Sequence, residues 1–304
     1  MSEVKRYATP VAFRNALSSR LRDRARTQRL PSNRICTLAL MERFLARVVA
    51  VFPESTVLKG GLALELRLDR ARTTRDIDLR LLGPPTEVPL LMARAASYRV
   101  EPDDFLTFSA ELDPEHPTLV GDGVVYEGSR YRVSAYIAAI PYGVPFGVDV
   151  SFADALHGEP VDLVGSDAFA FVGIPPVRVR AYPPGSHLAE KLHALTLPRR
   201  SESENTRLKD LPDIALIATI PGLDADDLLA AVRKTFAFRD THPVPIALPD
   251  PPGSWLERYR RLADDEGLEW QDLPQLMTAA RAFVEPVLAG RSGTWDPGSW
   301  TWRG

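Results

Sequence analysis

Residues 56–82 read TVLKGGLALELRLDRARTTRDIDLRLL, and their pattern predicts the centre of the fold. Its first residues, 56–58, form an apolar run that predicts a short strand, which Gly60-Gly61 ends before a helix over 62–68. Residues 75–82 alternate between polar and apolar side chains, which predicts a strand with one buried face. We therefore expect a strand, a glycine turn, a helix and a second strand in close succession.

Two acidic residues, Asp76 and Asp78, stand on the polar face of the second strand. Residues i and i+2 of a strand face the same way at about 3.3 Å of rise per residue, so both carboxylates can share one magnesium site. An exposed strand face could carry such acids by chance. Asp is disfavoured in strands, however, so an Asp-x-Asp between apolar residues favours a function.

A third acidic residue, Asp149, interrupts the apolar alternation of residues 146–152. On a neighbouring strand it would complete a two-metal site, although taken singly it could equally cap a turn. The Gly60-Gly61 turn would let backbone N–H groups approach a phosphate at the start of a helix. Gly-Gly turns without a ligand are nevertheless commoner, because glycine suits tight turns.

A helix is expected over residues 186–197, with Ser186 as its N-cap and a stripe of leucines as its buried face. Lys191 lies at the edge of that stripe, whereas Glu190 is expected to point away from it. Lys191 can therefore reach into a cleft, or it can cover apolar surface with its aliphatic stem.

The next helix is expected over about 207–220, and Asp210 and Asp213 share one of its faces. These acids suit the first turn of a helix because of its dipole. They could also hold Lys191 or help to bind a metal.

The remaining pattern predicts an α/β (α+β) fold, with a mixed twisted sheet flanked by helices and followed by a helical lobe. Residues 1–185 are expected to form the amino-terminal helices and the catalytic lobe, and residues 186–304 the helical lobe. Further helices are expected over 10–28, 32–51, 86–96, 224–236, 254–265 and 272–289, and further strands over 104–113, 123–141, 144–152 and 171–182. The tail from residue 291 shows no clear element.

The composition is that of a globular protein, with 304 residues, 45% hydrophobic and 25% charged. No segment approaches the roughly 20 apolar residues that span a bilayer, and the amino terminus does not resemble a secretory signal. Cys36 is the single cysteine, so no intrachain disulfide can form. A cytoplasmic protein without membrane association is therefore expected.

The net charge of −3 hides a strong asymmetry. Residues 1–50 hold 11 Lys or Arg and 3 Asp or Glu, so this segment carries +8 and the rest of the chain carries −11. Such a segment is either a surface for a polyanion or a solvated arginine-rich helix face. The candidates for contacts with nucleic acid are Arg20, Arg22, Arg24, Arg26 and Arg29.

Together these motifs resemble the AbiEii/AbiGii toxins, within the DNA polymerase β-type nucleotidyltransferase superfamily. The resemblance covers residues 40–220 and is strongest over 57–79. It rests on four segments: LKGGLAL at 58–64, RTTRDIDL at 72–79, EKLHAL at 190–195 and RLKDLPD at 207–213. Fourteen residues separate Gly61 from Asp76, which is towards the long end for the superfamily and leaves the placement of Gly61 over phosphates open.

The resemblance implies a toxin of a toxin-antitoxin system that uses two magnesium ions and an NTP. Its acceptor is expected to be the 3′ end of tRNA, as in similar mycobacterial toxins, so that translation is blocked. The implied metal ligands are Asp76, Asp78 and Asp149. The implied nucleotide-binding residues are Gly60, Gly61, Thr74, Lys191 and Asp210, with Asp213 orienting Lys191 or the nucleotide. A cognate antitoxin is an expected partner, and a monomer is the expected state.

Three alternatives remain open from the sequence. The first is nucleotide transfer to a protein side chain, of the antitoxin or of the toxin itself, which would not need the basic segment. The second is a module that binds RNA or a partner without catalysis, against which the intact acids at 76, 78 and 149 count. The third is an Asp-x-Asp glycosyltransferase, which leaves the Gly-Gly turn and Lys191 unexplained.

Overall fold

The computed structural model describes residues 7–68, 72–82, 85–121, 124–152, 154–198 and 204–304. Its first part comprises α1 (Pro10–Gln28), α2 (Ser32–Val51), β1 (Thr56–Lys59), α3 (Gly60–Arg67), β2 (Asp76–Leu81), a 3-10 turn (Pro85–Glu87), α4 (Val88–Ser97), β3 (Leu106–Leu112), β4 (Thr118–Gly121), β5 (Val124–Ile137), β6 (Ile140–Pro141), β7 (Phe146–Ser151), β8 (Val161–Val164), a second 3-10 turn (Ala170–Val172) and β9 (Arg178–Ala181). Its second part comprises α5 (Pro184–Thr196), α6 (Asp210–Ile217), α7 (Ala225–Arg239), α8 (Trp255–Glu266), α9 (Leu273–Leu288), β10 (Thr294–Asp296) and β11 (Thr301–Arg303).

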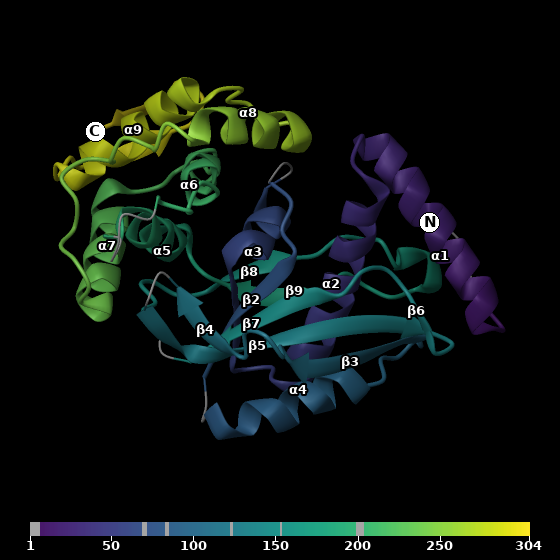
Figure 1. Ribbon diagram of the computed structural model, residues 1–304. Helices are drawn as coiled ribbons and strands as arrows, with labels where there is room; N and C mark the ends of the chain where they lie inside the picture. Colours follow the sequence, from purple (N-terminus) through teal and green to yellow (C-terminus); the bar gives the residue numbers. More distant parts are fainter. Residues whose placement is uncertain (1–6, 69–71, 83–84, 122–123, 153, 199–203) are drawn as a thin grey trace.

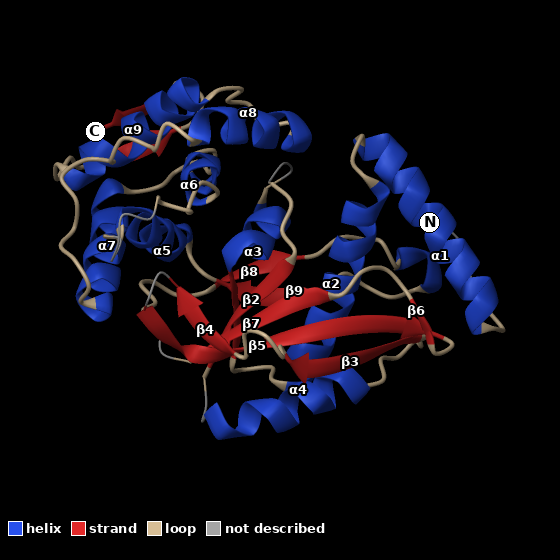
Figure 2. Ribbon diagram, in the orientation of Figure 1, coloured by secondary structure: helices blue, strands red, loops and turns tan. Residues whose placement is uncertain are grey.

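One mixed sheet organises the first part of the chain, as the sequence predicted. Its strand order is β3-β5-β7-β2-β1-β9-β8, and β4 and β6 also pair with β5. The pairs β2–β7 and β1–β9 are parallel, whereas the other pairs are antiparallel. Figures 1 and 2 show the sheet flanked by helices, with α4 along one side and the helices of the second part beyond the other. The predicted fold class is therefore confirmed.

The strand β2 has the alternation that its sequence predicted. Ile77, Leu79 and Leu81 are buried, whereas Asp76, Asp78 and Arg80 on the other face are only partly buried. A strand with this period of two places its apolar side chains in the core and leaves its carboxylates on the face opposite. The core thus fixes which way the Asp-x-Asp pair points.

Two clusters of buried apolar side chains fill the molecule. The first draws its buried residues from positions 13–181, and the second combines Leu64 with residues 188–302. Leu64 of α3 therefore packs with the second cluster, although its neighbours Leu62 and Ala63 belong to the first. We call these two parts the first and second lobes; the division into domains at 185/186 remains a prediction. No helix in the described ranges is long and apolar enough to cross a membrane.

The strand expected over 171–182 is shorter in the structure. Residues Ala170–Val172 form a 3-10 turn, and β9 begins only at Arg178. Pro175 and Pro176 lie between them, and proline has no N–H to donate to a sheet. The short strand β8 was not expected, and α6 is shorter than the helix predicted over 207–220.

The carboxyl-terminal tail forms a hairpin, where the sequence predicted no clear element. β10 and β11 pair so that Trp295 faces Trp302. Both rings pack against Phe283 of α9, at 5.0 and 5.7 Å between ring centroids. The Trp295 indole N–H donates to the carbonyl of Ala218 at 2.6 Å, and that of Trp302 donates to the carbonyl of Phe283 at 2.9 Å. Strands of three residues are too short to show a period, so tertiary packing makes this hairpin.

We predict that Trp295→Ala destabilises the protein by about 3–5 kcal/mol, because it removes a large aromatic ring from a packed core. The ring is only 2% exposed. The measurement is chemical denaturation followed by circular dichroism. Ile246→Ala is the control, since Ile246 is 94% exposed and should shift stability by less than about 0.5 kcal/mol. Equal effects of the two substitutions on stability would show that the tail does not contribute to the second cluster of buried side chains.

Candidate active site

A cavity of about 670 Å³ opens between the polar face of the sheet and helices α5, α6 and α7. Both lobes line it, because β1, β2, β5 and β7 supply one wall and the second-lobe helices supply the other. Its charged lining consists of Lys59, Asp78, Glu115, Arg130, Asp149, Asp154, Glu190, Lys191, Arg207, Asp210 and Arg239. Acidic and basic side chains therefore face one another across a space that could hold a small charged molecule.

The two acidic strands lie side by side in this wall. β2 pairs in parallel with β7, with Asp78 opposite Asp149 and Asp76 opposite Gly147. Adjacent strands lie about 4.8 Å apart, and residues in register share a face, so the carboxylates of Asp78 and Asp149 are neighbours. The structure thus places Asp78 beside Asp149 in the cavity wall, whereas Asp76 lies opposite Gly147 and is not among the described residues that line the cavity.

Two glycines leave room for these carboxylates. A Cβ added at Gly147 would overlap the Asp76 carboxylate, and one added at Gly60 would overlap that of Asp78. Gly60 also has a φ of +65°, a conformation that favours glycine. Among the described residues predicted to bind phosphate, Gly60 lines the cavity, whereas the buried Gly61 lies against Thr74. Gly60 therefore has a packing role in addition to the predicted role at a phosphate.

The two carboxylates of β2 are partly shielded from water and lie close to the negative charge of Asp149. Burial, and next the charge of Asp149, raise the pKa of Asp78 from 3.8 to about 7. Burial, and next Asp149, also raise the pKa of Asp76. A cation placed against these groups would favour their ionised forms.

Asp149 already has a cationic partner. Arg130 of β5 lies opposite it in the sheet and donates from Nε and Nη2 to its two oxygens, at 2.7 and 2.6 Å. Within the described ranges, no three His, Cys, Asp or Glu side chains form a group that could hold a metal ion. Magnesium needs only a few carboxylates, with water and phosphate oxygens completing its shell. As they lie, Asp76, Asp78 and Asp149 do not form one three-carboxylate group, and Arg130 holds both oxygens of Asp149. One or two of these carboxylates, with water and phosphate oxygens, fit the chemistry of magnesium.

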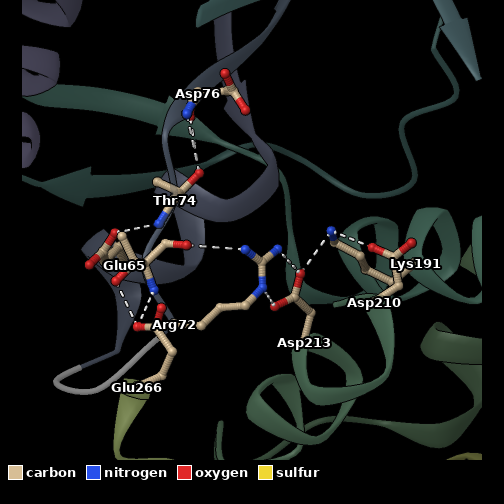
Figure 3. A network of polar contacts seen from close by, with 9 residues as sticks. Glu65, Arg72, Thr74, Asp76, Lys191, Asp210, Asp213 and Glu266 are labelled. Atoms are coloured by element: carbon tan, nitrogen blue, oxygen red, sulfur yellow. Dashed lines mark hydrogen bonds and ion pairs between the residues drawn. The ribbon is translucent and has the colours of Figure 1, made fainter. Parts of the chain in front are cut away.

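Lys191 is held between two carboxylates of α6. Its ammonium lies 2.9 Å from Asp210 and 2.8 Å from Asp213. Burial opposes the charge of Lys191, but Asp210 and Asp213 outweigh burial and raise its pKa. Asp213 is fully buried and also accepts two hydrogen bonds from Arg72, both at 2.7 Å (Figure 3). Lys191 and Asp210 line the cavity, whereas Asp213 can act there only through its partners.

The same charges explain why Asp213 stays ionised. Burial would raise the pKa of its carboxyl, but Lys191 and Arg72 lower it to about 2. A buried carboxylate with two cationic partners fixes both of them in place. The geometry is therefore that of an acidic strand pair facing an anchored lysine.

The AbiEii model, which describes the nucleotidyl transferase toxin of a type IV toxin-antitoxin system, matches residues 43–283. The chain belongs to this family. Membership implies a nucleotidyltransferase that uses an NTP and has an antitoxin as partner. No curated protein matches the chain at a significant level.

Among the solved structures that match, one toxin shares the fold of this chain. The chain is similar to MenT4, a nucleotidyltransferase toxin from Mycobacterium tuberculosis H37Rv, with a TM-score of 0.57 and 15% identity over 94% of this chain and 92% of that one. It also matches JHP933 from Helicobacter pylori, with a TM-score of 0.41 and 14% identity over 82% and 92% of the two chains. The second similarity is too low to support an argument, and the first shows the fold alone.

A second charged cluster in the cavity of this AbiEii-family chain was not predictable from the sequence pattern. Lys59 donates hydrogen bonds to Asp154 and to Glu190, the latter at 3.2 Å. Arg239, the last residue of α7, forms ion pairs with the same two carboxylates. Glu190 was expected to point away from the leucine stripe, and on that side of α5 it lines the cavity. The stripe shows which face of a helix is buried, and it does not show what the opposite face meets.

The arginines of α1 lie apart from the cavity. None of Arg20, Arg22, Arg24, Arg26 and Arg29 is among the described residues that line it, and Figure 1 shows α1 on the opposite side of the view from α5 and α7. Arg20 covers the ring of Phe171 at 4.2 Å. Arg24 pairs with Asp167 at 2.7 Å, and Arg26 pairs with Asp23 at 3.2 Å. Arg22 and Arg29 are exposed. Any role of this helix therefore concerns a ligand that extends beyond the cavity.

We predict that Asp78→Asn stabilises the metal-free protein at pH 8. The pKa of Asp78 rises from 3.8 to about 7 on folding, so the folded state holds the proton more tightly than the unfolded state. The ionised carboxylate therefore costs stability progressively as the pH rises from about 4 through 7, and this cost is absent below both pKa values.

Thermal unfolding between pH 5 and 8 in the presence of a chelator measures this effect. The difference in melting temperature between Asp78→Asn and the parent protein should grow from pH 5 to pH 8 and be largest at pH 8. Asp162→Asn, at an exposed position of β8, is the control and should show no such trend. A constant difference across the pH range would show that Asp78 does not titrate in this way.

Proposed function

We propose that the protein is a magnesium-dependent nucleotidyltransferase that transfers NMP from an NTP to the 3′ end of tRNA and thereby blocks translation. The observation that carries this proposal is the alignment of Asp78 with Asp149 across two parallel strands, facing Lys191 over a cavity. Asp78 and Asp149 on the sheet wall suit divalent cations, and Lys191 on the helix wall suits the phosphates that those cations also bind. Each wall also carries charges of the other sign. Family membership supports the choice of nucleotidyl transfer.

Different residues of the site would have different roles in this reaction. Asp76, Asp78 and Asp149 would hold two magnesium ions, which would supply positive charge at the triphosphate and at the attacking hydroxyl. Lys191, oriented by Asp210 and Asp213, would neutralise a β- or γ-phosphate oxygen. Gly60 and Gly61 at the start of α3, with Thr74 beside them, would contact the phosphates.

The bonds exchanged in this proposal balance. The acceptor oxygen forms a bond to the α-phosphorus, and the bond from that phosphorus to the bridging oxygen of the β-phosphate breaks. Pyrophosphate leaves with the electron pair of the broken bond. The hydroxyl proton passes to Asp149, which then releases it to water. In this step Arg130 has to share or release Asp149, since it engages both oxygens.

The acceptor would lie across both lobes, which we take to be domains of residues 1–185 and 186–304. The basic amino-terminal segment would contact the phosphates of the tRNA body, while the 3′ end of the tRNA reaches the cavity. The separation of α1 from the cavity suits a long acceptor such as tRNA (Figure 1). We propose a monomer, because one chain supplies all the charged groups described above.

We predict that Asp76→Ala lowers label transfer by at least about 100-fold, since a lost metal ligand removes several kcal/mol of charge stabilisation. The protein is incubated with total tRNA, magnesium and each α-labelled NTP in turn, and products are separated from unreacted NTP. Asp162→Ala is the matched control, because Asp162 is an exposed acid on another strand of the same sheet. It should keep full activity.

The position of the label distinguishes the alternatives. Label on RNA that depends on Asp76 supports the proposal. Label on protein points to transfer to a side chain instead. Absence of label with every NTP, at a magnesium concentration that saturates other enzymes of this kind, would contradict nucleotidyl transfer and favour a binding module.

We predict that replacing Arg22, Arg26 and Arg29 with Gln weakens tRNA binding and reduces its salt dependence. Each lost phosphate contact should lower the slope of log K against log salt by about 0.7–0.9. Filter binding or fluorescence anisotropy over a series of salt concentrations measures both quantities. The control is the same triple change at Arg258, Arg260 and Arg261, which are exposed on α8. If the α1 variant binds with an unchanged slope, the basic segment is a solvated helix face.

A further inference from the structure

A residue of the second lobe reaches the segment that precedes the acidic strand. Glu266 is the last residue of α8, and its Oε2 accepts hydrogen bonds from the Thr73 backbone N–H at 2.8 Å and from the Thr73 hydroxyl at 2.6 Å. The same oxygen accepts from Arg34 of α2 at 2.8 Å. One carboxylate oxygen therefore ties together α8, α2 and the backbone three residues before Asp76.

Arg34 extends this contact to a second carboxylate. It donates to Glu65 of α3 from Nε at 3.1 Å and from Nη2 at 2.7 Å. Glu65 accepts from the Thr74 backbone N–H at 3.5 Å. The Thr74 hydroxyl in turn lies 3.2 Å from the carbonyl oxygen and 3.5 Å from the amide nitrogen of Asp76. The chain of contacts thus ends on the backbone of the first predicted metal ligand.

The other end of the segment is fixed as firmly. Arg72 binds Asp213 through two hydrogen bonds, and Asp213 pairs with Lys191. Figure 3 shows that Glu65 and Glu266 are joined to Arg72 through the segment Thr73–Thr74, whose Thr73 carbonyl accepts a hydrogen bond from Arg72 at 3.3 Å. From Arg72 the network continues to Asp213 and Lys191. The network therefore joins the acidic strand to the lysine on the opposite wall of the cavity.

The part of the network formed by Arg34, Glu65 and Glu266 is largely buried and lies outside the site cavity. The side chains of Arg34, Glu65 and Glu266 are 7%, 8% and 13% exposed. None of the three is among the described residues that line the site cavity. A buried charge that loses one partner leaves the remaining charges uncompensated, so the geometry of such a network is tightly specified. These groups can affect the reaction only by holding other groups in place.

We propose that Glu266 is a positioning residue, which sets the place of Asp76 and Asp78 for metal binding by fixing the Thr73–Thr74 backbone from the second lobe. This proposal rests on the proposed function for the metal site, but its structural half can be tested without any metal. It also assigns a role to the chain beyond residue 240, whose part in the site the sequence did not reveal.

The test compares Glu266→Ala and Glu266→Gln with Glu257→Ala. Glu257 lies on the same helix, is 67% exposed and pairs only with Arg260 among the contacts described, so it controls for changes to α8. The first readout is amide hydrogen exchange over residues 72–78 without metal, which should be faster in Glu266→Ala than in the control. The second is the affinity for Mn²⁺, measured by electron paramagnetic resonance, which should fall about 10–100-fold.

The conservative variant separates positioning from simple stability. Glu266→Gln keeps an acceptor oxygen for Thr73, so it should recover part of the Mn²⁺ affinity that Glu266→Ala loses. Excess Mg²⁺ should restore the turnover rate of Glu266→Ala more than that of a variant lacking Asp76. If Glu266→Ala does not fold, Thr73→Val removes the shorter contact from the other side.

The outcomes distinguish this inference from the proposed function. Unchanged Mn²⁺ affinity in Glu266→Ala, with a lowered melting temperature, would overturn the positioning role and leave a structural one. If the parent protein itself binds no Mn²⁺, the proposed function fails, and faster exchange at residues 72–78 still supports the positioning of this segment. Unchanged exchange in that segment would overturn the inference in either case.

Discussion

The pairing of Asp78 with Asp149 across two parallel strands is the constraint on which the rest of the site depends. Two carboxylates in register on one face of a sheet repel each other, and burial makes the repulsion stronger. The surroundings supply charges of the opposite sign: Arg130 lies against Asp149, and Lys59 and Lys191 lower the pKa of Asp78. The acids are thus held close together at a cost that a bound cation would remove, which is a physical reason for a metal site at this place.

Backbone shape makes this arrangement possible. Gly60 and Gly147 leave the space that the two carboxylates of β2 occupy, so these glycines are required by the acids beside them. A β-turn or phosphate contact would explain Gly60 alone, but it would not explain Gly147, which is the second residue of β7. Glycine inside a strand is unfavourable unless another group approaches closely, and here that group is Asp76.

Local patterns in the sequence predicted much of this structure. The period of two over residues 75–82 placed Asp76 and Asp78 on one face, and the apolar alternation around Asp149 predicted its strand. The partners of these acids were not predictable in the same way. Arg130 meets Asp149 only through the register of β5 with β7, and Arg72 meets Asp213 across 141 residues. Such pairs depend on how the elements pack, which no local period records.

The same limit applies to the second lobe. Glu190 and Lys191 are adjacent in α5, and the leucine stripe does not show that both line the cavity. The tail hairpin depends on two tryptophans packing against α9, and its strands are too short to have a recognisable pattern.

The contact of Thr73 with Glu266 also bears on the order in which the chain is synthesised. Because chains grow from the amino terminus, a ribosome makes the acidic strand long before it makes residue 266. A nascent or truncated chain that ends before α8 lacks this acceptor for Thr73, so the Thr73 backbone gains the contact only after residue 266 has been made.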